Sequence, residues 1–464
     1  MRGVCLRAVI VAALLHIAPS GADAQRSTIE RLLRDTVLAN GLHVIVLPIH
    51  TIPVATIEVV VRNGAFTQLD PADEGIPHLL EHMLFKSFGG GPGSDFGTRA
   101  AELHAGYNGT TSDESVTYYL TLPSRNAPRG IQLLAELMRE PRFRQEELVT
   151  ERRVVQGELE RNAANPNFVL SVLLNRLLWG PAAGRKEAAG NVLSVLGADA
   201  DRLRRYYERY YVPNNSAVVI TGDVEPAEAF AHAARHFDRW KRGADPFEDR
   251  PIPAIPALAR DTVAVVVDGE SSDITVSLRW QGPSVGADED ETYAADVFSA
   301  LVNQPHSGMQ KRLVETGLFQ SVWVSYTTLD HVGPIMLSAR TTPEKVVPAM
   351  LALRSELSRF DDPEYFSEEE LRIAAKQLQV EAALELEGGS MLAHTIGFWW
   401  SVAGLDYYLG YVDDLGTRTP DDLRRYVERY IVGKPKVVGM LVSDATRTEY
   451  ETQLAESMTQ WFWP

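Results

Sequence analysis

The residues with the clearest chemistry stand together at His78-Leu79-Leu80-Glu81-His82. The apolar run around them, residues 75–85, has no β-branched residue after Ile76 and carries Pro77 where a first helical turn tolerates it, so it predicts a helix. Because positions i and i+4 lie on one helix face, both imidazoles can bind one metal ion. Glu81 stands beside them, placed to take a proton from a metal-bound water. The alternative is two ordinary histidines on a buried or exposed helix face.

A catalytic zinc ion takes three protein ligands and keeps one position for water, so a third ligand is needed. The best candidate is Glu158, in the strongly helical stretch 151–161. Glu151 and Glu158 are seven residues apart, two turns along one face. One of them can bind the metal while the other orients a ligand. Glutamates also line ordinary solvated helix faces, so the spacing alone does not decide between these possibilities.

The stretch from Gly75 to Lys86 resembles the zinc-binding helix of the pitrilysin family, which includes insulin-degrading enzyme and the mitochondrial processing peptidases. Its histidine and glutamate order inverts His-Glu-x-x-His and is the inverzincin motif. The family places a glutamate ligand about 75 residues beyond the second histidine, with another glutamate seven residues earlier. Here Glu158 follows His82 by 76 residues and Glu151 by seven. The resemblance implies a Zn²⁺ cofactor with His78, His82 and Glu158 as ligands, Glu81 as general base and Glu151 as its supporting carboxylate.

A second segment, residues 107–118, resembles the part of the family whose edge strand pairs with the backbone of the substrate. The resemblance implies that Asn108, Gly109 and Thr110 bind substrate. Family members usually carry an aromatic residue where Thr110 stands, so substrate packing at this position departs from the family. A plain edge strand with its hairpin is the alternative.

The N-terminus reads as a secretory signal peptide, residues 1–24, with a basic start, an apolar core and a small-x-small cleavage site. A mitochondrial transit peptide fits less well, because the apolar core is continuous and poor in serine. The single cysteine, Cys5, lies inside this segment, so the mature chain can form no disulfide. These features predict export to a bacterial periplasm. Removing the leader changes the formal net charge from −17 to −18, which disfavours binding to nucleic acid or anionic membranes.

An internal repeat predicts two homologous domains. Residues 201–212 recur as residues 421–432 with nine of twelve positions identical, and a weaker echo joins residues 57–64 with 274–280. A period of 220 residues indicates a duplicated domain rather than a solenoid. The predicted divisions are 25–245 for a zinc-bearing catalytic domain and 246–464 for a homologous non-catalytic domain, joined in a Pro- and Asp-rich stretch.

Hydrophobic periodicity predicts an α+β fold, in which each half has a mostly antiparallel sheet packed with helices. Strands are expected at 43–47, 55–62, 115–122, 217–223, 262–267, 274–280, 334–339 and 437–443, and helices at 74–88, 128–139, 145–163, 199–211, 225–238, 288–303, 344–358, 367–387 and 420–431. The second-half counterpart of the zinc helix is about Glu291 to Asn303 and contains no histidine. Only the first half is therefore expected to be catalytic.

The second half departs from the family at one further place. Related peptidases carry an arginine and a tyrosine, seven residues apart, that assist substrate or oxyanion binding. Here Gln320 stands at the tyrosine position and Arg312 is one residue out of register. Residues 315–319 resemble the zinc-bearing subunit of the mitochondrial processing peptidase, which works with a non-catalytic homologous partner. The expected function is thus a zinc-dependent endopeptidase that hydrolyses peptides or unfolded segments in a dimer chamber, as the catalytic subunit of a heterodimer.

Two alternatives to this expectation remain open. The chain could instead act as a homodimer. The same fold also serves as a non-catalytic scaffold or assembly subunit, although such members have usually lost part of the zinc motif. Two substrate ranges are compatible with the expected enzyme, namely one dedicated peptide and many different peptides.

Overall fold

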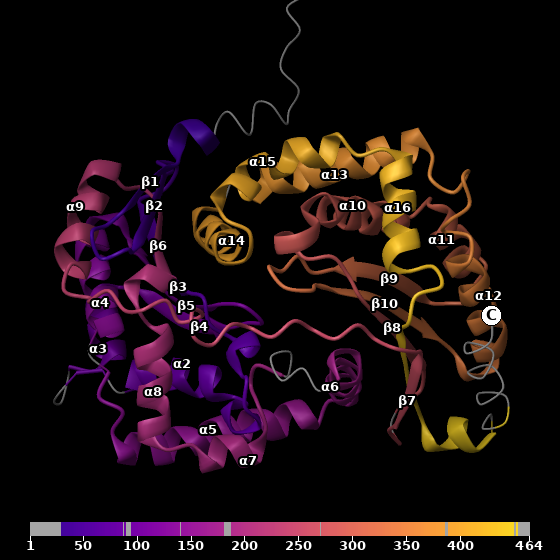
Figure 1. Cartoon of the computed structure of the whole chain (residues 1–464), viewed down its shortest axis with the longest axis horizontal. Coiled ribbons are helices and arrows are strands. Elements are labelled where there is room, and N and C mark those ends of the chain that lie inside the picture. Colours follow the sequence, from indigo (N-terminus) through magenta and orange to yellow (C-terminus); the bar gives the residue numbers. More distant parts are fainter. Residues whose placement is uncertain are drawn as a thin grey trace, which may run out of the picture.

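The computed structural model describes residues 29–449 and 452, apart from residues 87, 90–93, 140, 181–186, 270, 386 and 387. The predicted leader, residues 1–24, lies outside the described residues. The described chain forms two α+β halves that stand side by side, each with its own sheet (Figure 1). None of the helices in the described part combines the length and hydropathy that crossing a lipid bilayer requires.

The first half contains β1 (Arg34–Val37), β2 (His43–Pro48), β3 (Val54–Val61), α2 (Ile76–Lys86), α3 (Phe96–Glu102), β4 (Gly106–Thr111), β5 (Val116–Pro123), α4 (Ala127–Arg139), α5 (Gln145–Ala163), α6 (Pro166–Trp179), α7 (Val192–Gly197), α8 (Ala200–Tyr210), β6 (Ser216–Gly222) and α9 (Pro226–Phe237). The second half contains β7 (Thr262–Val267), β8 (Ile274–Gln281), α10 (Val285–Asn303), α11 (Gly308–Gln310), β9 (Ser321–Tyr326), β10 (Pro334–Thr341), α12 (Val346–Leu357), α13 (Glu368–Glu385), α14 (Gly389–Val402), α15 (Leu405–Gly416), α16 (Pro420–Tyr430) and β11 (Val437–Val442).

The two sheets repeat one topology. Their strand orders are β1-β2-β6-β3-β5-β4 and β7-β11-β8-β10-β9, so that, without β1, each strand of the first has a counterpart at the same place in the second. The β2–β6 and β7–β11 pairs are parallel, and the other described pairs are antiparallel. The predicted α+β class with two mostly antiparallel sheets is confirmed. The division at residues 245 and 246 falls in the segment that joins the sheets and stays a prediction.

One face of each sheet is covered by helices of its own half. In the first half, side chains of β2, β3, β5 and β6 pack with those of α2, α4, α5, α8 and α9 in one buried core. The central strand β3 is buried along almost its whole length, which suits its run of Val, Ile and Thr residues. A strand with so little polar sequence must have both faces covered.

The second face of each sheet is covered by a helix of the other half. Helix α14 packs on β3 and β6, where Leu392 and Ile396 join a core with Ile45, Val60 and Val219 (Figure 1). Helix α6 packs on β7, β8 and β11 in the reciprocal arrangement. The halves therefore exchange one helix each.

Equivalent arginines, one half-buried and one buried, bind the exchanged helices. Arg62, at the end of β3, donates to the carbonyl oxygen of Trp400 in α14 at 3.0 Å, and its guanidinium lies 4.4 Å from the centre of the Trp400 ring. Its repeat counterpart Arg279, in β8, donates to the carbonyl oxygen of Ser171 in α6 at 3.1 Å and also bonds Asn175. Burial lowers the pKa of both guanidinium groups.

The expected strands and helices are all present close to the expected residues, but several elements were not foreseen. These are β1, β9, α3, α6, α7, α11, α14 and α15. Two of them, α6 and α14, are the exchanged helices. Each is apolar on more than one side because it is wedged between a sheet and other elements, so it lacks the amphipathic period by which surface helices are recognised.

An ion pair between Glu58 of β3 and His394 of α14 generates a pH prediction. The contact with Glu58 raises the pKa of His394 against the opposing effect of burial. Because the folded-state pKa of His394 lies above the unfolded value, the ion pair stabilises the fold below about pH 6.5, and its contribution is lost as the pH rises through the folded pKa. Burial raises the pKa of the Glu58 carboxyl, so protonation of Glu58 removes the ion pair again at lower pH.

We therefore expect His394→Gln to destabilise the chain by about 1–2 kcal/mol at pH 5.5 and by less at pH 8.5, because a charge-assisted contact is lost only where the histidine is charged. Denaturant unfolding at both pH values measures the difference. His306→Gln, at an exposed histidine, is the control. If His394→Gln lowered the free energy of unfolding equally at both pH values, the charged ion pair with Glu58 would be contradicted.

Candidate metal centre and catalytic site

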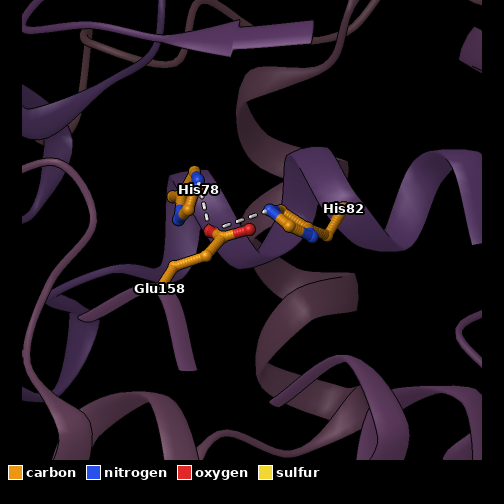
Figure 2. Close-up of side chains that lie close together, drawn as sticks. All are labelled: His78, His82 and Glu158. Atoms are coloured by element: carbon orange, nitrogen blue, oxygen red, sulfur yellow. Dashed lines mark ion pairs between the residues drawn. The ribbon is translucent and has the colours of Figure 1, made fainter. Parts of the chain in front are cut away.

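Helix α2 presents three polar side chains of the site from an otherwise apolar helix. Leu79, Leu80, Met83 and Leu84 are buried in the core of the first half and fix the rotation of the helix. His78 and His82 therefore emerge together on the other side, with ring centres 4.8 Å apart (Figure 2). The predicted placement of the two imidazoles on one helix face is what the structure shows.

Helix α5 brings Glu158 to the two histidines. Its Oε2 lies 3.8 Å from Nε2 of His78 and 3.6 Å from Nε2 of His82, and Figure 2 shows the carboxylate turned toward both rings. One donor atom from each residue lies within 4.8 Å of the other two. Among the described residues, this is the only group of three such side chains that could hold a metal ion.

Glu151, two turns earlier on α5, reaches the other nitrogen of His82. Its Oε2 lies 3.3 Å from Nδ1 of His82, and its Oε1 lies 3.4 Å from Nζ of Lys86. The residue is 3% exposed. A carboxylate at Nδ1 favours the tautomer with a proton there, which leaves the Nε2 lone pair for a metal.

Glu81 is held by the edge strand β4. It is 7% exposed and accepts a hydrogen bond at Oε2 from the Thr111 hydroxyl at 2.6 Å. Gly109 lies against the same carboxyl group, because a Cβ atom there would stand 2.8 Å from both Cγ and Oε1 of Glu81. The backbone of β4 thus approaches Glu81 as closely as a residue without a side chain allows.

Burial shapes the charge states of the site. It lowers the pKa of His78 to about 4, with help from neighbouring His82, so His78 is neutral at neutral pH, as a metal ligand must be. Burial acts to lower the pKa of His82 too, but Glu151 and Glu158 outweigh it and raise that pKa. Burial raises the pKa of Glu81 despite its hydrogen bond from Thr111. A raised pKa makes a carboxylate a stronger base.

Other sequence-derived candidates lie where a substrate could reach them. Asn108 and Thr110 are exposed on β4, which pairs only with β5 in the sheet as described. Their role in substrate binding stays a prediction. Thr111 was not singled out from the sequence. The signal that could have found it is the period of two along a strand, which puts Gly109 and Thr111 on one side.

The two second-half residues are engaged in contacts of their own. Arg312 is bound by the buried carboxylate of Glu356, with Nε–Oε2 2.5 Å and Nη2–Oε1 2.6 Å. Exposed Gln320 donates to Asp273 at 3.1 Å. Neither residue belongs to the metal-binding cluster.

Two family models match the chain. Residues 44–186 match the model described as Insulinase (Peptidase family M16), and residues 197–378 match the Peptidase M16 inactive domain. An uncharacterized zinc protease of Streptomyces coelicolor is 24% identical over 417 residues, covering 87% of this chain and 88% of its own length. The zinc protease PqqE of Helicobacter pylori is 24% identical over 291 residues, covering 60% and 63%.

Solved structures share the fold. A protease from Helicobacter pylori superposes with a TM-score of 0.77 at 21% identity, over 88% of this chain and 99% of that one. The periplasmic protease PqqL from Escherichia coli gives 0.76 at 18% identity, over 92% of this chain and 50% of its own. The two halves match two models of one family, which confirms the expected resemblance. The chain belongs to peptidase family M16, the insulinase family.

Proposed function

We propose that this chain is a zinc-dependent endopeptidase that hydrolyses peptides or unfolded segments. The observation that carries the proposal is the convergence of two imidazoles and one carboxylate beside a buried glutamate that is not one of the three. Three nitrogen and oxygen donors with one open position are typical of catalytic rather than structural zinc. Relatives that are named zinc proteases support the same chemistry.

The donor set fits a zinc ion. Donors bound at about 2.0–2.2 Å in a tetrahedron lie about 3.3–3.6 Å apart. The separations between Glu158 and the two histidines, 3.6 and 3.8 Å, are too long for good hydrogen bonds and need only a small contraction to meet that value. When bound, zinc would supply a Lewis acid and lower the pKa of a water molecule toward neutrality.

Glu81 is the general base in this proposal. Its Oε1 faces Gly109 on β4, while Thr111 occupies its Oε2. An extended peptide added along the free edge of β4 would have its backbone close to this carboxylate. Glu81 takes the proton of the attacking water and returns it to the leaving amine. Asn108, Gly109 and Thr110 would bind the peptide backbone.

We further propose a dimer whose facing chains enclose a chamber, with this chain as the catalytic subunit of a heterodimer. The engagement of Arg312 by Glu356, together with glutamine at position 320, supports a partner that supplies the arginine and tyrosine groups. We place the protein in the bacterial periplasm, supported by the N-terminal sequence and by a structural neighbour described as periplasmic. A scaffold subunit is the alternative function, which one bound zinc per chain would disfavour.

We expect Glu151→Gln to weaken zinc binding about 10- to 100-fold, because His82 loses the carboxylate that orients its ring. Competition with a chelator of known affinity measures the change. Glu160→Gln, at an exposed position of the same helix, is the matched control and should leave the affinity unchanged. Equal zinc affinities in the wild type and both variants would show that Glu151 does not support zinc binding.

We expect Glu81→Gln to abolish hydrolysis of a mixed quenched-fluorescent peptide set while one zinc per chain is retained, because the amide cannot accept the proton. The mature, zinc-loaded chain is assayed in parallel with the variant. Hydrolysis that persists in the variant would exclude Glu81 as the base. Wild-type activity of the chain alone would overturn the heterodimer and indicate a homodimer, whereas a folded, zinc-bound but inactive chain would direct the search to a homologous partner.

We expect Gly109→Ala to lower kcat about tenfold with zinc retained, because its methyl group would displace the Glu81 carboxylate by a fraction of an ångström. Gly106→Ala on the same strand is a matched control, since a Cβ atom there meets nothing within 4 Å. Neither glycine has a positive φ, so backbone strain does not separate the two variants. Equal effects on kcat would refute the steric explanation.

A further inference from the structure

The turn between β4 and β5, residues 112–115, reaches across to the second half. Glu114 in this turn is 2% exposed. Its Oε2 accepts a hydrogen bond from the backbone N–H of Asp330 at 2.8 Å, and its Oε1 accepts one from the N–H of His331 at 3.1 Å. The same Oε1 lies 3.0 Å from Nδ1 of His331. A buried carboxylate from the first half is therefore held by the β9–β10 loop of the second.

This contact lies at the seam between the halves. Glu114, Asp330 and His331 line a cavity of about 850 Å³ together with residues of both halves and of the connecting segment. The His331 ring also packs on Phe66, with ring centres 5.4 Å apart. Hydrogen bonds to a buried charge are stronger than those between neutral groups, so the Glu114 contact is a firm polar link beside an open space.

The other end of the same turn touches the proposed general base. Thr111, three residues before Glu114, donates to Glu81, and Ser112 closes the turn through its N–H to the carbonyl oxygen of Ser115 at 2.9 Å. The N–H groups of Ala65 and Phe66 bond the carbonyl oxygens of Ser112 and Asp113 at 3.0 and 2.9 Å. The turn is short and these backbone hydrogen bonds restrain it, so we expect a displacement at Glu114 to move Thr111 as well.

We propose that Glu114 is a positioning residue through which the second half sets the place of β4 and the orientation of Glu81. The inference rests on the proposed function and assigns the second half a part in it. Glu114 touches no reacting atom. Glu114 anchors the turn, and the turn fixes the position of the Thr111 hydroxyl. That hydroxyl determines which carboxylate oxygen of Glu81 faces the substrate.

Glu114→Gln tests the link with little change in shape. A carboxylate offers two acceptor oxygens, and a glutamine amide offers one acceptor and one donor group. One of the two backbone N–H groups of the loop would therefore face another donor. Glu58→Gln is the matched control, because Glu58 is also a buried glutamate paired with a histidine of the other half and lies away from the turn.

We expect Glu114→Gln to lower kcat about tenfold with zinc content unchanged, as a small misplacement of a catalytic group does. Glu58→Gln should lower the unfolding midpoint without that loss of kcat. Thr111→Val should lower kcat by a similar factor, and the double variant Thr111→Val/Glu114→Gln should be scarcely worse than either single variant. Effects on kcat that multiply in the double variant would overturn the proposal.

Hydrogen exchange of the zinc-loaded proteins gives a readout that does not need activity. The backbone amides of residues 106–111 should exchange faster in Glu114→Gln than in the wild type. Their exchange rates should be unchanged in Glu58→Gln. If the wild-type chain alone hydrolyses no peptide, the comparison of kcat values requires the partner subunit of the proposed heterodimer, whereas the hydrogen-exchange comparison still decides the coupling. If Glu114→Gln does not fold, His331→Ala is the second variant, because it keeps both backbone donors to Glu114. It should also speed the exchange of residues 106–111, by a smaller factor. Unchanged exchange at residues 106–111 in the variant that folds would overturn the proposal.

Discussion

The covering of two apolar sheet faces is the constraint on which the rest of the structure depends. The helices that each half packs on its own sheet cover only one face of that sheet. The central strands, however, carry apolar side chains on both faces. A bare second face would leave a large apolar area in water, at about 25 cal/mol per Å². The exchange of α6 and α14 removes both exposed faces at once, and it fixes the two halves against each other.

Each exchanged helix approaches its sheet closely at a glycine. A Cβ atom at Gly397 of α14 would lie 2.7 Å from Val60 of β3, and one at Gly439 of β11 would lie 2.6 Å from Leu174 of α6. In one case the glycine is on the helix and in the other on the strand. The duplicated halves have therefore solved the same packing problem by different substitutions. The polar contacts at Arg62 and Arg279, by contrast, are shared by both.

With the halves fixed, the site is assembled from elements that are individually stiff. The two candidate histidine ligands and the proposed base come from one helix. The candidate glutamate ligand and Glu151, which contacts His82, come from another. The edge strand β4 contacts Glu81 through Thr111 and, in the described sheet, pairs with β5 alone. Rigid elements hold catalytic groups more precisely than loops do.

Much of this arrangement could be predicted from the sequence, for physical reasons that differ by element. The spacing of His78 and His82 determines their common face once the stretch is helical, and the repeat at 201–212 and 421–432 predicts the second copy of the fold. The positions of the exchanged helices could not be predicted. A uniformly apolar segment is expected to be buried, but its sequence does not indicate which sheet it will pack against. Thr111 and Glu114 were also missed, since their partners lie in contacts that only folding brings together.

The exchange has a consequence for biosynthesis. The second face of the first sheet is finished by α14, whose first residue, Gly389, follows the last residue of β6 by 167 positions. The first half therefore cannot complete its core while it is emerging alone from the ribosome. Its strands keep one apolar face open until nearly the whole chain has been made. A chain built in this way stays incompletely folded for most of its synthesis, and its first sheet depends on residues made long after its own strands.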